Sequence, residues 1–587
     1  MKMSASALVC LAAAALGLAR LDVAAATYVV SQSHGAAGDD NPGTADKPLK
    51  TIGAAAKLVK AGDTVVIHAG VYREQVAVDA DGTVAAPITF RAASGERVVV
   101  TGADLLTRWR KEAGEGNVFS TPWPHRFITH YKSMAHPNDD RHRMIGRAEQ
   151  VFVHAYPLGQ VLRRDQLSRG TFHVDVEAKR LYVWSRDNRD LTAGRVGVEA
   201  SVRPLIWRSG GAHVHLKGLR FRYCANAAQR GAVRIEGSDN VVEDCVSERA
   251  NSIGASFTGR RGVVRRCVFQ HNGQMGFSAV RAHGMLMTGC VVQFNSTKGW
   301  DRGWEAGGNK IVLCRSLVIE KTRCIQNAGH GIWFDIGNEG CVVRNCLLAG
   351  NDNCGLFYEI SYGLHARDNV IVGNGFYGST GAWGADGGIA VSSSPGCRIE
   401  RNLIVGNKEG FQFREQIRST PKIDGRRSHA VWNHDEIVRN NLIASNRDWQ
   451  VGGWFDILDG RHWPRAMQAG WEVDKRKLEQ ALADYKAKGQ PPGLSLEKLG
   501  IRFEKNVYWA RAPQGLWLWG CTWRRHKRYA SVDAVRKELK LETGSASARP
   551  AFADAAALDL RLPADHPAIR MGSYPRGEVP GVRLGTR

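Results

Sequence analysis

The chain has 587 residues, which is enough for several compact domains or for one elongated repeat domain with insertions. Its 65 glycines against 19 prolines exclude a disordered Pro/Gly tract and favour a turn-rich β architecture. The formal net charge of +23 suits an acidic partner. We expect no nucleic acid, because no basic motif is interleaved with aromatic residues as in single-strand binders.

Residues 1–26 have the layout of a cleavable secretory signal. Lys2 is followed by an apolar run over 5–19 and by small residues up to Ala26. We therefore expect cleavage near Ala26 and a secreted protein, either extracellular or periplasmic. No later segment reaches about 18 uninterrupted apolar residues, so the sequence predicts no membrane span.

Residues 27–102 are predicted to form an N-terminal cap followed by the first strands of a repeat. A helix is expected near Thr51, since four apolar residues follow at helical spacing: Ile52, Ala55, Ala56 and Val59. The preceding loop carries three oxygen-bearing side chains that are compatible with Ca²⁺, namely Asp39, Asp40 and Asn41. Apart from that weak signal, we expect no metal site and no required cofactor.

Residues 103–200 interrupt this pattern with a Trp-rich stretch and two alternating segments, EQVFVHAYPLGQV and GTFHVDVEAKRLYVW. Alternation of apolar and polar residues is typical of antiparallel strands with one buried face. The sequence therefore predicts a small β insertion domain here.

Residues 201–446 repeat one short unit, as in VVEDCVSERAN (241–251), VVRRCVFQHNG (263–273) and CVVRNCLLAGN (341–351). Strand-like alternation that ends at Asn or Gly, with a period of 22 to 24 residues, indicates the coils of a parallel β-helix. One ladder position recurs through these units: Cys245, Cys267, Cys290, Cys324, Cys346, Asn369, Asn402 and Asn441. Regular spacing favours small buried cysteines over disulfides or metal ligands, and the asparagines are expected to bond their neighbours along the stack.

Residues 447–498 carry a charged helical pattern, WEVDKRKLEQALADYKAK, and are predicted to be a helical insertion. Residues 499–587 begin with the strand unit IRFEKNVYWA. They are expected to supply the last coil and a loop-like closing segment, LDLRLPADHPAIRMG, that ends the stack.

The chain resembles the secreted, pectate-lyase-like right-handed parallel β-helix proteins, and most nearly glycoside hydrolase family 141. Three stretches carry the resemblance: the cap NPGTADKPLKTIGAAAKLVKAGDTVVIHAGVYRE, the coil units and the closing segment LDLRLPADHPAIRMG. It implies an all-β solenoid with an N-terminal capping helix and a small β insertion domain. It also implies a carbohydrate-active enzyme, although the same scaffold serves hydrolases, lyases, epimerases and adhesins.

Four strands follow a recurring glycine: GIWFD (331–335), GLFYE (355–359), GIAVS (388–392) and GFQFR (410–414). The period of two points Trp333 and Asp335 outward, and Phe357 and Glu359 likewise. Asp335 and Glu359 are one coil apart, so their Cα atoms are expected roughly 4.8 Å apart. Like charges so close raise the pKa of one member, which gives the acid and the base that glycoside hydrolysis needs.

A third candidate, Glu305, lies in GWEAG (303–307) and is expected level with Trp333 on the same face. Adjacent acids approach the roughly 5 Å of a retaining enzyme, whereas Glu305 and Glu359 can span the roughly 6.5–9.5 Å of an inverting one. Which residue is the acid stays open. The weaker candidates on this face are Asp301, Asp386 and Glu415.

Aromatic, amide, basic and histidine side chains in register with the acids are candidate substrate ligands: Trp304, Trp333, Phe357, Arg414, Gln412, His330 and His365. The sequence thus favours a secreted, monomeric glycoside hydrolase acting on a plant or algal type polysaccharide, which can be acidic. A lyase or epimerase would use Arg414, Arg281 or Lys310 as its base. A non-catalytic glycan-binding protein is the third reading.

Overall fold

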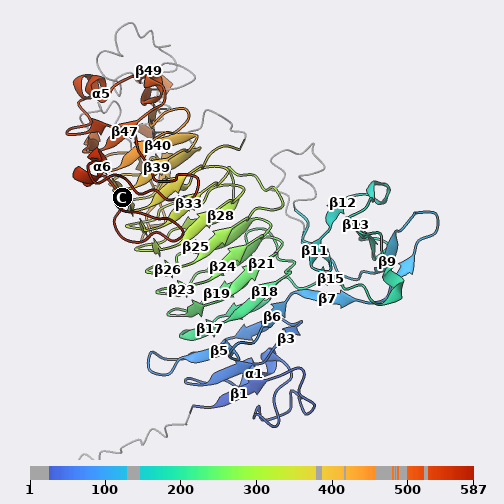
Figure 1. The fold of residues 1–587 in the computed structure, drawn as a ribbon. Coiled ribbons are helices and arrows are strands. Elements are labelled where there is room, and N and C mark those ends of the chain that lie inside the picture. Colours follow the sequence, from blue (N-terminus) through green and yellow to red (C-terminus); the bar gives the residue numbers. More distant parts are fainter. Residues whose placement is uncertain are drawn as a thin grey trace, which may run out of the picture.

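The computed structural model describes residues 25–128, 146–377, 386–415, 418–455, 499–520 and 526–587, with five further positions between 479 and 487. Most of the predicted signal peptide and of the predicted helical insertion therefore lies outside the described residues. The rest winds into an elongated right-handed parallel β-helix, from which a small β domain projects (Figure 1). This confirms the predicted fold class.

Three long sheets of 13 strands each form the walls of the described β-helix, and the chain visits sheets A, B and C in turn. Sheet A contains β1 (Thr27–Val30), β2 (Thr64–Ile67), β5 (Ile88–Ala92), β17 (Val214–Lys217), β20 (Val241–Glu243), β23 (Val263–Arg265), β26 (Leu286–Thr288), β29 (Val318–Glu320), β32 (Val342–Arg344), β35 (His365–Arg367), β38 (Arg398–Glu400), β43 (Ile437–Arg439) and β46 (Arg502–Glu504).

Sheet B contains β3 (Gly70–Tyr72), β6 (Val98–Thr101), β18 (Leu219–Arg222), β21 (Val246–Glu248), β24 (Val268–Gln270), β27 (Val291–Gln293), β30 (Arg323–Ile325), β33 (Leu347–Ala349), β36 (Val370–Val372), β39 (Leu403–Val405), β44 (Leu442–Ala444), β47 (Val507–Trp509) and β50 (Ala546–Ser547). Sheet C contains β4 (Val76–Val78), β16 (Trp207–Ser209), β19 (Gly231–Ile235), β22 (Ile253–Phe257), β25 (Met275–Val280), β28 (Gly307–Val312), β31 (Ile332–Asp335), β34 (Leu356–Glu359), β37 (Gly387–Ser392), β40 (Glu409–Glu415), β45 (Val451–Phe455), β48 (Trp517–Gly520) and β49 (His526–Tyr529).

Each coil buries the inward half of its alternating strands in one continuous apolar core that runs along the axis. Sharp corners close the coils. At the corner between sheets A and B a single residue adopts the left-handed region, as Asp244 (φ 54°), Arg266 (φ 53°) and Asn345 (φ 53°) show. A small buried residue follows, for example Cys245 after Asp244, and the strand of sheet B begins at the next residue.

Two side-chain ladders fill the corners. The repeat predicts the one between sheets A and B, where Asn369 donates to Asn402 at 2.9 Å and Asn402 to Asn441 at 3.0 Å. Between sheets B and C, Nδ2 of each asparagine donates to Oδ1 of the next at 2.8–3.0 Å through Asn272, Asn295, Asn327, Asn351, Asn374, Asn407 and Asn446. The ten cysteines among the described residues are all buried and free. In the corner between sheets A and B, Thr322 and not Cys324 follows Cys290, because Cys324 lies two residues later and pairs with Val292.

Asn351→Ala is expected to lower the free energy of unfolding by about 2 kcal/mol, because buried partners on both sides lose a hydrogen bond. Asn351 accepts from Asn327 and donates to Asn374 and to the Cys324 carbonyl. Urea titration measures the change. Val84→Ala, at a position that is 86% exposed, is the control and should leave stability unchanged; equal stability of both variants would contradict a structural ladder.

The N-terminal end is covered by helix α1 (Ile52–Leu58), which confirms the predicted cap. Thr51 is its N-cap and accepts a hydrogen bond from the Ala54 amide at 3.1 Å. The helix buries Ile52, Ala55 and Ala56 against the first coils.

The projecting domain is the predicted β insertion, and it has a core of its own (Figure 1). One sheet has the order β11 (Tyr156–Pro157), β10 (Val151–Val153), β15 (Val198–Ser201) and β7 (Ala103–Leu106). The other has the order β12 (Gly159–Val161), β13 (Thr171–Asp175), β14 (Arg180–Trp184), β9 (Phe119–Pro122) and β8 (Arg110–Lys111). All pairings are antiparallel except β12 with β13.

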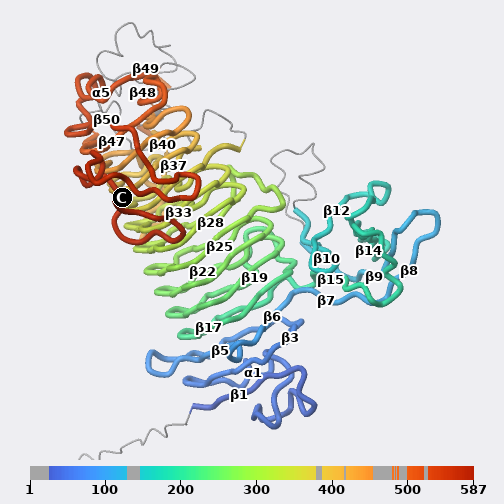
Figure 2. The backbone as a smooth tube through the Cα atoms, in the orientation of Figure 1, coloured from blue at the N-terminus to red at the C-terminus, as the bar shows by residue number. Residues whose placement is uncertain are grey.

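The C-terminal segment also packs along the side of the β-helix. After helix α5 (Val532–Leu539), the chain runs back along the outside of sheet B in a segment that includes helix α6 (Pro567–Arg570) (Figure 2). Its residues Leu560, Leu562 and Tyr574 pack on the outer face of β33, β36 and β39.

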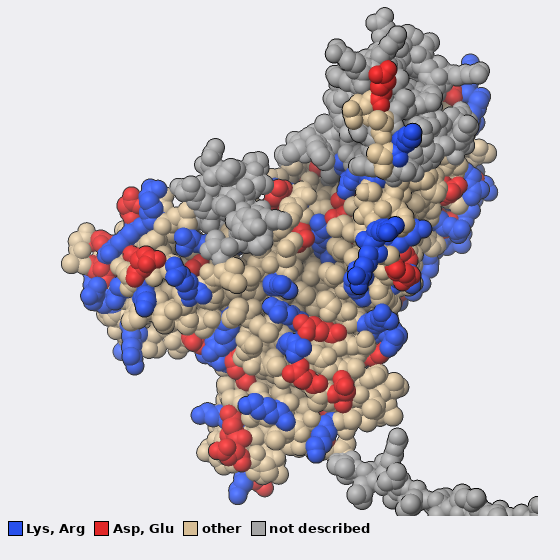
Figure 3. Space-filling model, turned by 180° about the vertical axis from the view of Figure 1, so that it is seen from behind, with Lys and Arg blue, Asp and Glu red and all other residues tan. Residues whose placement is uncertain are grey.

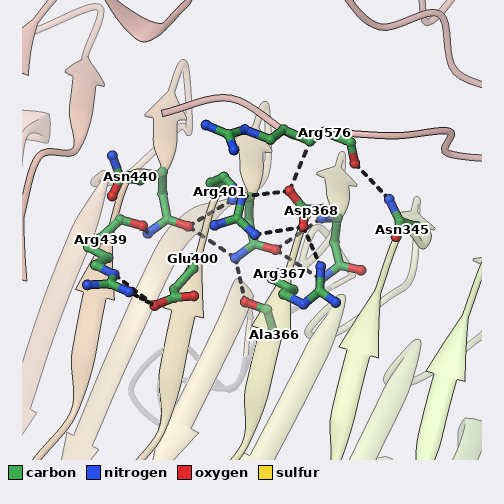
Figure 4. A network of polar contacts seen from close by, with 12 residues as sticks. Asn345, Ala366, Arg367, Asp368, Glu400, Arg401, Arg439, Asn440 and Arg576 are labelled. Atoms are coloured by element: carbon green, nitrogen blue, oxygen red, sulfur yellow. Dashed lines mark hydrogen bonds and ion pairs between the residues drawn. The ribbon is translucent and has the colours of Figure 1, made fainter. Parts of the chain in front are cut away.

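Polar contacts fix this returning segment, which we call the C-terminal strap (residues 558–582). The Arg576 amide donates to Asp368, whose carboxylate also accepts from Arg367 and Arg401 (Figure 4). Asn345 donates to the Arg576 carbonyl at 2.9 Å. The strap therefore bridges neighbouring coils at the corner of sheets A and B.

Candidate functional site

Two carboxylates are neighbours on the outer side of sheet C. Asp335 ends β31 and Glu359 ends β34, and these strands pair in register, Phe334 with Tyr358. Adjacent strands are about 4.8 Å apart. Because Phe334 and Tyr358 lie in the main core, the residues that follow them point away from it. The register thus places the two acids together, in the way that the sequence period predicts.

A lysine faces Asp335. Lys310 Nζ lies 2.9 Å from Asp335 Oδ2 and 3.9 Å from Glu305 Oε1. It also donates to the Trp304 carbonyl at 3.0 Å and lies 4.1 Å from the centroid of the Trp333 ring. The lysine thus places a charge-assisted hydrogen-bond donor directly against the Asp335 carboxyl group.

Glu359 has a different environment. Its Oε1 accepts a hydrogen bond from Trp333 Nε1 at 3.1 Å, and its Oε2 lies 3.3 Å from Arg418 Nη1. Burial, with a smaller contribution from the charge of Asp335, raises the pKa of Glu359 to about 7, although Arg418 and Arg414 oppose the rise. One acid is thus paired with a lysine while the other takes up its proton near neutral pH, which is how two carboxyls divide acid and base roles.

Arg418 is a site residue that the sequence does not indicate. It begins the hairpin of β41 (Arg418–Pro421) and β42 (Ser428–Val431), which leaves the end of β40 and folds back over earlier coils. The hairpin brings Arg418 to Glu359, 59 residues away in the chain. Neither repeat spacing nor a motif signals this contact.

Glu305 belongs to the site but not at the predicted level. In the register Ile311 pairs with Phe334, so Lys310 and not Glu305 lies level with Trp333. The reason is a turn before the strand: the Glu305 amide bonds to the Asp301 carbonyl, and β28 begins only at Gly307. Glu305 approaches from this turn, where Gln229 donates to it at 2.8 Å and burial raises its pKa.

The aromatic residues are structural supports and not open sugar platforms. Trp333 is 2% exposed and Phe357 is 4% exposed, and their rings stack with centroids 5.8 Å apart. His330 packs on both rings at 4.9 Å, and burial lowers its pKa to about 3, so it is neutral. Trp304 is partly buried against Trp300. The expectation of exposed stacking faces is therefore wrong for Trp333 and Phe357.

Arg414 and Gln412 lie farther along the same face, as expected. Glu359 pairs with Ser392, and Ser392 pairs with Arg414, so these three side chains form one row with Asp335. Gln412 is buried and donates to Glu409 at 2.5 Å. It is therefore engaged by the protein itself.

The remaining candidates serve local structure. His365 lies on sheet A, where its Nε2 is 3.0 Å from Glu400 Oε2, so its predicted place beside the acids is wrong. Asp386 pairs with Lys408 at 2.6 Å. Asp301 accepts from the Gly303 amide, and Glu415 accepts from the Asn433 amide. The prediction for His365 was wrong because the distance of a residue from a turn in the sequence does not determine which sheet its strand joins.

The structure also shows where the other candidate bases and the candidate Ca²⁺ ligands lie. Arg281 is exposed just beyond β25, and Lys310 is engaged by Asp335. Asp39 accepts from the Lys50 and Thr51 amides, which fastens the loop before α1. Within the described part of the chain, no three His, Cys, Asp or Glu side chains are grouped to hold a metal ion, and no described helix is long and apolar enough to cross a membrane.

The positive charge is dispersed. On the face shown in Figure 3, basic and acidic side chains are interspersed along the coils. Many form pairs between neighbouring strands, for example Arg265 with Glu243 and Arg344 with Glu320, each at 2.5 Å.

Comparison with known proteins agrees with this architecture. A family model described as "Right handed beta helix region" matches residues 205–385. Among solved structures, the chain is similar to one described as the complex of XylC with xylose. The TM-score is 0.66 at 16% identity, over 90% of this chain and 87% of that chain. Identity at this level shows a shared fold, a right-handed parallel β-helix.

Two curated proteins match short segments. One is the uncharacterized protein YwoF of Bacillus subtilis, 42% identical over 67 residues, and the other is pectate lyase PEL9 of Emericella nidulans, 36% identical over 69 residues. Each alignment covers 11% of this chain, and they cover only 14% and 17% of those relatives. The activities of the whole relatives therefore do not carry over directly.

Proposed function

We propose that the protein is a retaining glycoside hydrolase in which Asp335 is the nucleophile and Glu359 is the general acid and base. The observation that carries this proposal is the pair of adjacent carboxylates in opposite electrostatic environments. Side chains on adjacent coils approach the roughly 5 Å separation of retaining enzymes.

In the first step the Asp335 carboxylate, held by Lys310, attacks the anomeric carbon and the glycosidic bond breaks. Glu359 gives its proton to the leaving oxygen, because its raised pKa keeps it protonated near neutral pH. In the second step Glu359 takes a proton from water, which attacks the glycosyl ester and frees Asp335. The indole of Trp333 orients Glu359 throughout.

The small exposure of the acids supports action at a chain end. Asp335 and Glu359 are each 7% exposed, which fits entry of one terminal sugar better than passage of a polymer. Xylosides are the first substrates to test, since the similar β-helix XylC has been solved with xylose. Plant and algal type polysaccharides and acidic glycans complete the panel.

When the purified protein is incubated with this panel of glycans, we expect new reducing ends to form without the ultraviolet absorbance of unsaturated products. Proton NMR should show that the first sugar released keeps its anomeric configuration. An inverted product would instead make Glu305 the partner of Glu359.

A lyase or epimerase on an acidic glycan is the second candidate, favoured by the segment similar to pectate lyase PEL9 and by the net charge of +23. Unsaturated products would establish it. Binding without any product would support a glycan-binding protein.

We further propose export with cleavage near Ala26, a monomeric state and catalysis without a required cofactor. Two carboxylates complete the proposed reaction, so activity should be unchanged after dialysis against EDTA. A loss restored by Ca²⁺ would contradict this and would direct attention to Asp39, Asp40 and Asn41.

A further inference from the structure

A cleft away from the proposed catalytic acids is lined in part by the hairpin β41–β42 and has a volume of about 690 Å³. Turns that follow three successive strands of sheet C form its floor, at Glu339–Gly340, Tyr362–Gly363 and Pro395–Gly396. These turns are stacked, since the Gly340 amide donates to the Tyr362 carbonyl and the Gly363 amide to the Pro395 carbonyl, each at 2.9 Å. None of these residues belongs to the proposed catalytic site.

The hairpin joins this cleft to the catalytic site. At its base Arg418 reaches Glu359, and further along the Ile423 amide donates to Glu339 Oε1 at 3.0 Å. Near its tip Asp424 pairs with Arg315 at 2.5 Å. Lys422, Asp424 and neighbouring residues then line the cleft. A ligand in the cleft would therefore contact the same hairpin that contacts Glu359.

Each turn in the floor of the cleft contributes one glycine. Gly340, Gly363 and Gly396 have φ values of 59°, 65° and 70°, which glycine adopts without strain. No atom lies within 4 Å of the position that a Cβ would take at Gly340 or at Gly396. Three stacked glycines, one from each turn, therefore leave space in which a ligand can approach the backbone.

The walls of the cleft combine one aromatic ring with hydrogen-bond donors and acceptors. The ring of half-buried Tyr362 lies 5.6 Å from Lys422 Nζ. Among the described residues, no hydrogen-bond partner faces the Tyr362 hydroxyl, and such buried groups are usually satisfied by a ligand or water. Glu339 and His429 supply further polar atoms.

We propose that this cleft is a second, non-catalytic saccharide-binding site. An aromatic ring, three stacked glycines and closely spaced donors and acceptors match the apolar faces and hydroxyls of sugars. The volume is within the roughly 300–1,000 Å³ of small-molecule sites. The inference rests on the proposed function only for its choice of ligand, an oligosaccharide of the chain that the enzyme cleaves.

Calorimetric titration of Asp335→Asn, in which we expect turnover to be lost, tests the proposal with xylotetraose and with tetragalacturonate. We expect two equivalents of one of these probes to bind. The double variant Tyr362→Ala/Lys422→Met in the same background should lose one equivalent, or bind it at least tenfold more weakly. Lys217→Met on sheet A is the matched control and should keep both.

The second site is overturned if Asp335→Asn and the double variant in its background bind the same number of equivalents, whether none, one or two. Tyr362→Phe/Lys422→Met, which keeps the ring, guards against misfolding and should weaken the same equivalent. Failure of the proposed function looks different. The panel would then show no hydrolysis by the unmodified protein, while the equivalent that depends on Tyr362 would still bind.

Discussion

Asp335→Asn should lower kcat on the best substrate of the panel by about 10⁴-fold, while binding of that substrate persists. The amide is nearly isosteric but cannot form the glycosyl ester, and its loss of charge leaves Lys310 without its closest anion. Initial rates and calorimetric affinity on the same preparation separate the two effects.

Rescue distinguishes a nucleophile from a merely charged neighbour. Asp335→Gly opens space for a small anion, so azide should restore turnover and yield a glycosyl azide. Ser392→Ala, one coil beyond Glu359 in the same row, is the control and should change kcat far less. Full activity of Asp335→Asn would remove this residue from the mechanism.

Glu359→Gln should lower kcat by about 10²- to 10⁴-fold for substrates with poor leaving groups and much less for aryl glycosides. Proton donation by the general acid speeds bond cleavage only where the oxygen of the leaving group is basic. In the unmodified protein, burial raises the pKa of Glu359 to about 7 and the acid must be protonated to act. The rate should therefore fall as the pH rises through about 7, and this limb should vanish in Glu359→Gln.

Two variants test the assignment. Arg418→Met removes a cation that lowers the pKa of Glu359, so the basic limb should move to higher pH. Glu305→Gln should leave that limb in place. If Glu305→Gln abolished the limb and Glu359→Gln did not, Glu305 would be the acid.

The fold was predictable because every coil of a solenoid repeats the same sequence pattern. Each coil carries the same alternation and the same corner residues, so the core and the ladder through Asn369, Asn402 and Asn441 are visible in several coils. The cap helix was predictable from Thr51 and its apolar spacing. The return of the C-terminal strap was not, because its contacts with Asp368 and Asn345 join segments about 200 residues apart without any periodic signal.

The candidate site was predictable only where it follows the repeat. Asp335 and Glu359 lie on strands of regular spacing, so their neighbourhood follows from counting residues. Glu305 was wrongly placed level with Trp333 because a turn delays the start of β28, and residue spacing does not reveal such a turn. Arg418 enters by a hairpin, and the burial of Trp333 depends on packing that a single strand does not encode.

The C-terminal strap changes how the molecule should come apart. A plain solenoid can open one coil at a time from its end, since each coil touches only its neighbours. Here residues 558–582 lie across β33, β36 and β39, and Asn440 also donates to the Met571 carbonyl. Releasing one coil would expose apolar surface on several others. We therefore expect the coils under the strap to unfold together and not one at a time, which protects the coils that carry Asp335 and Glu359.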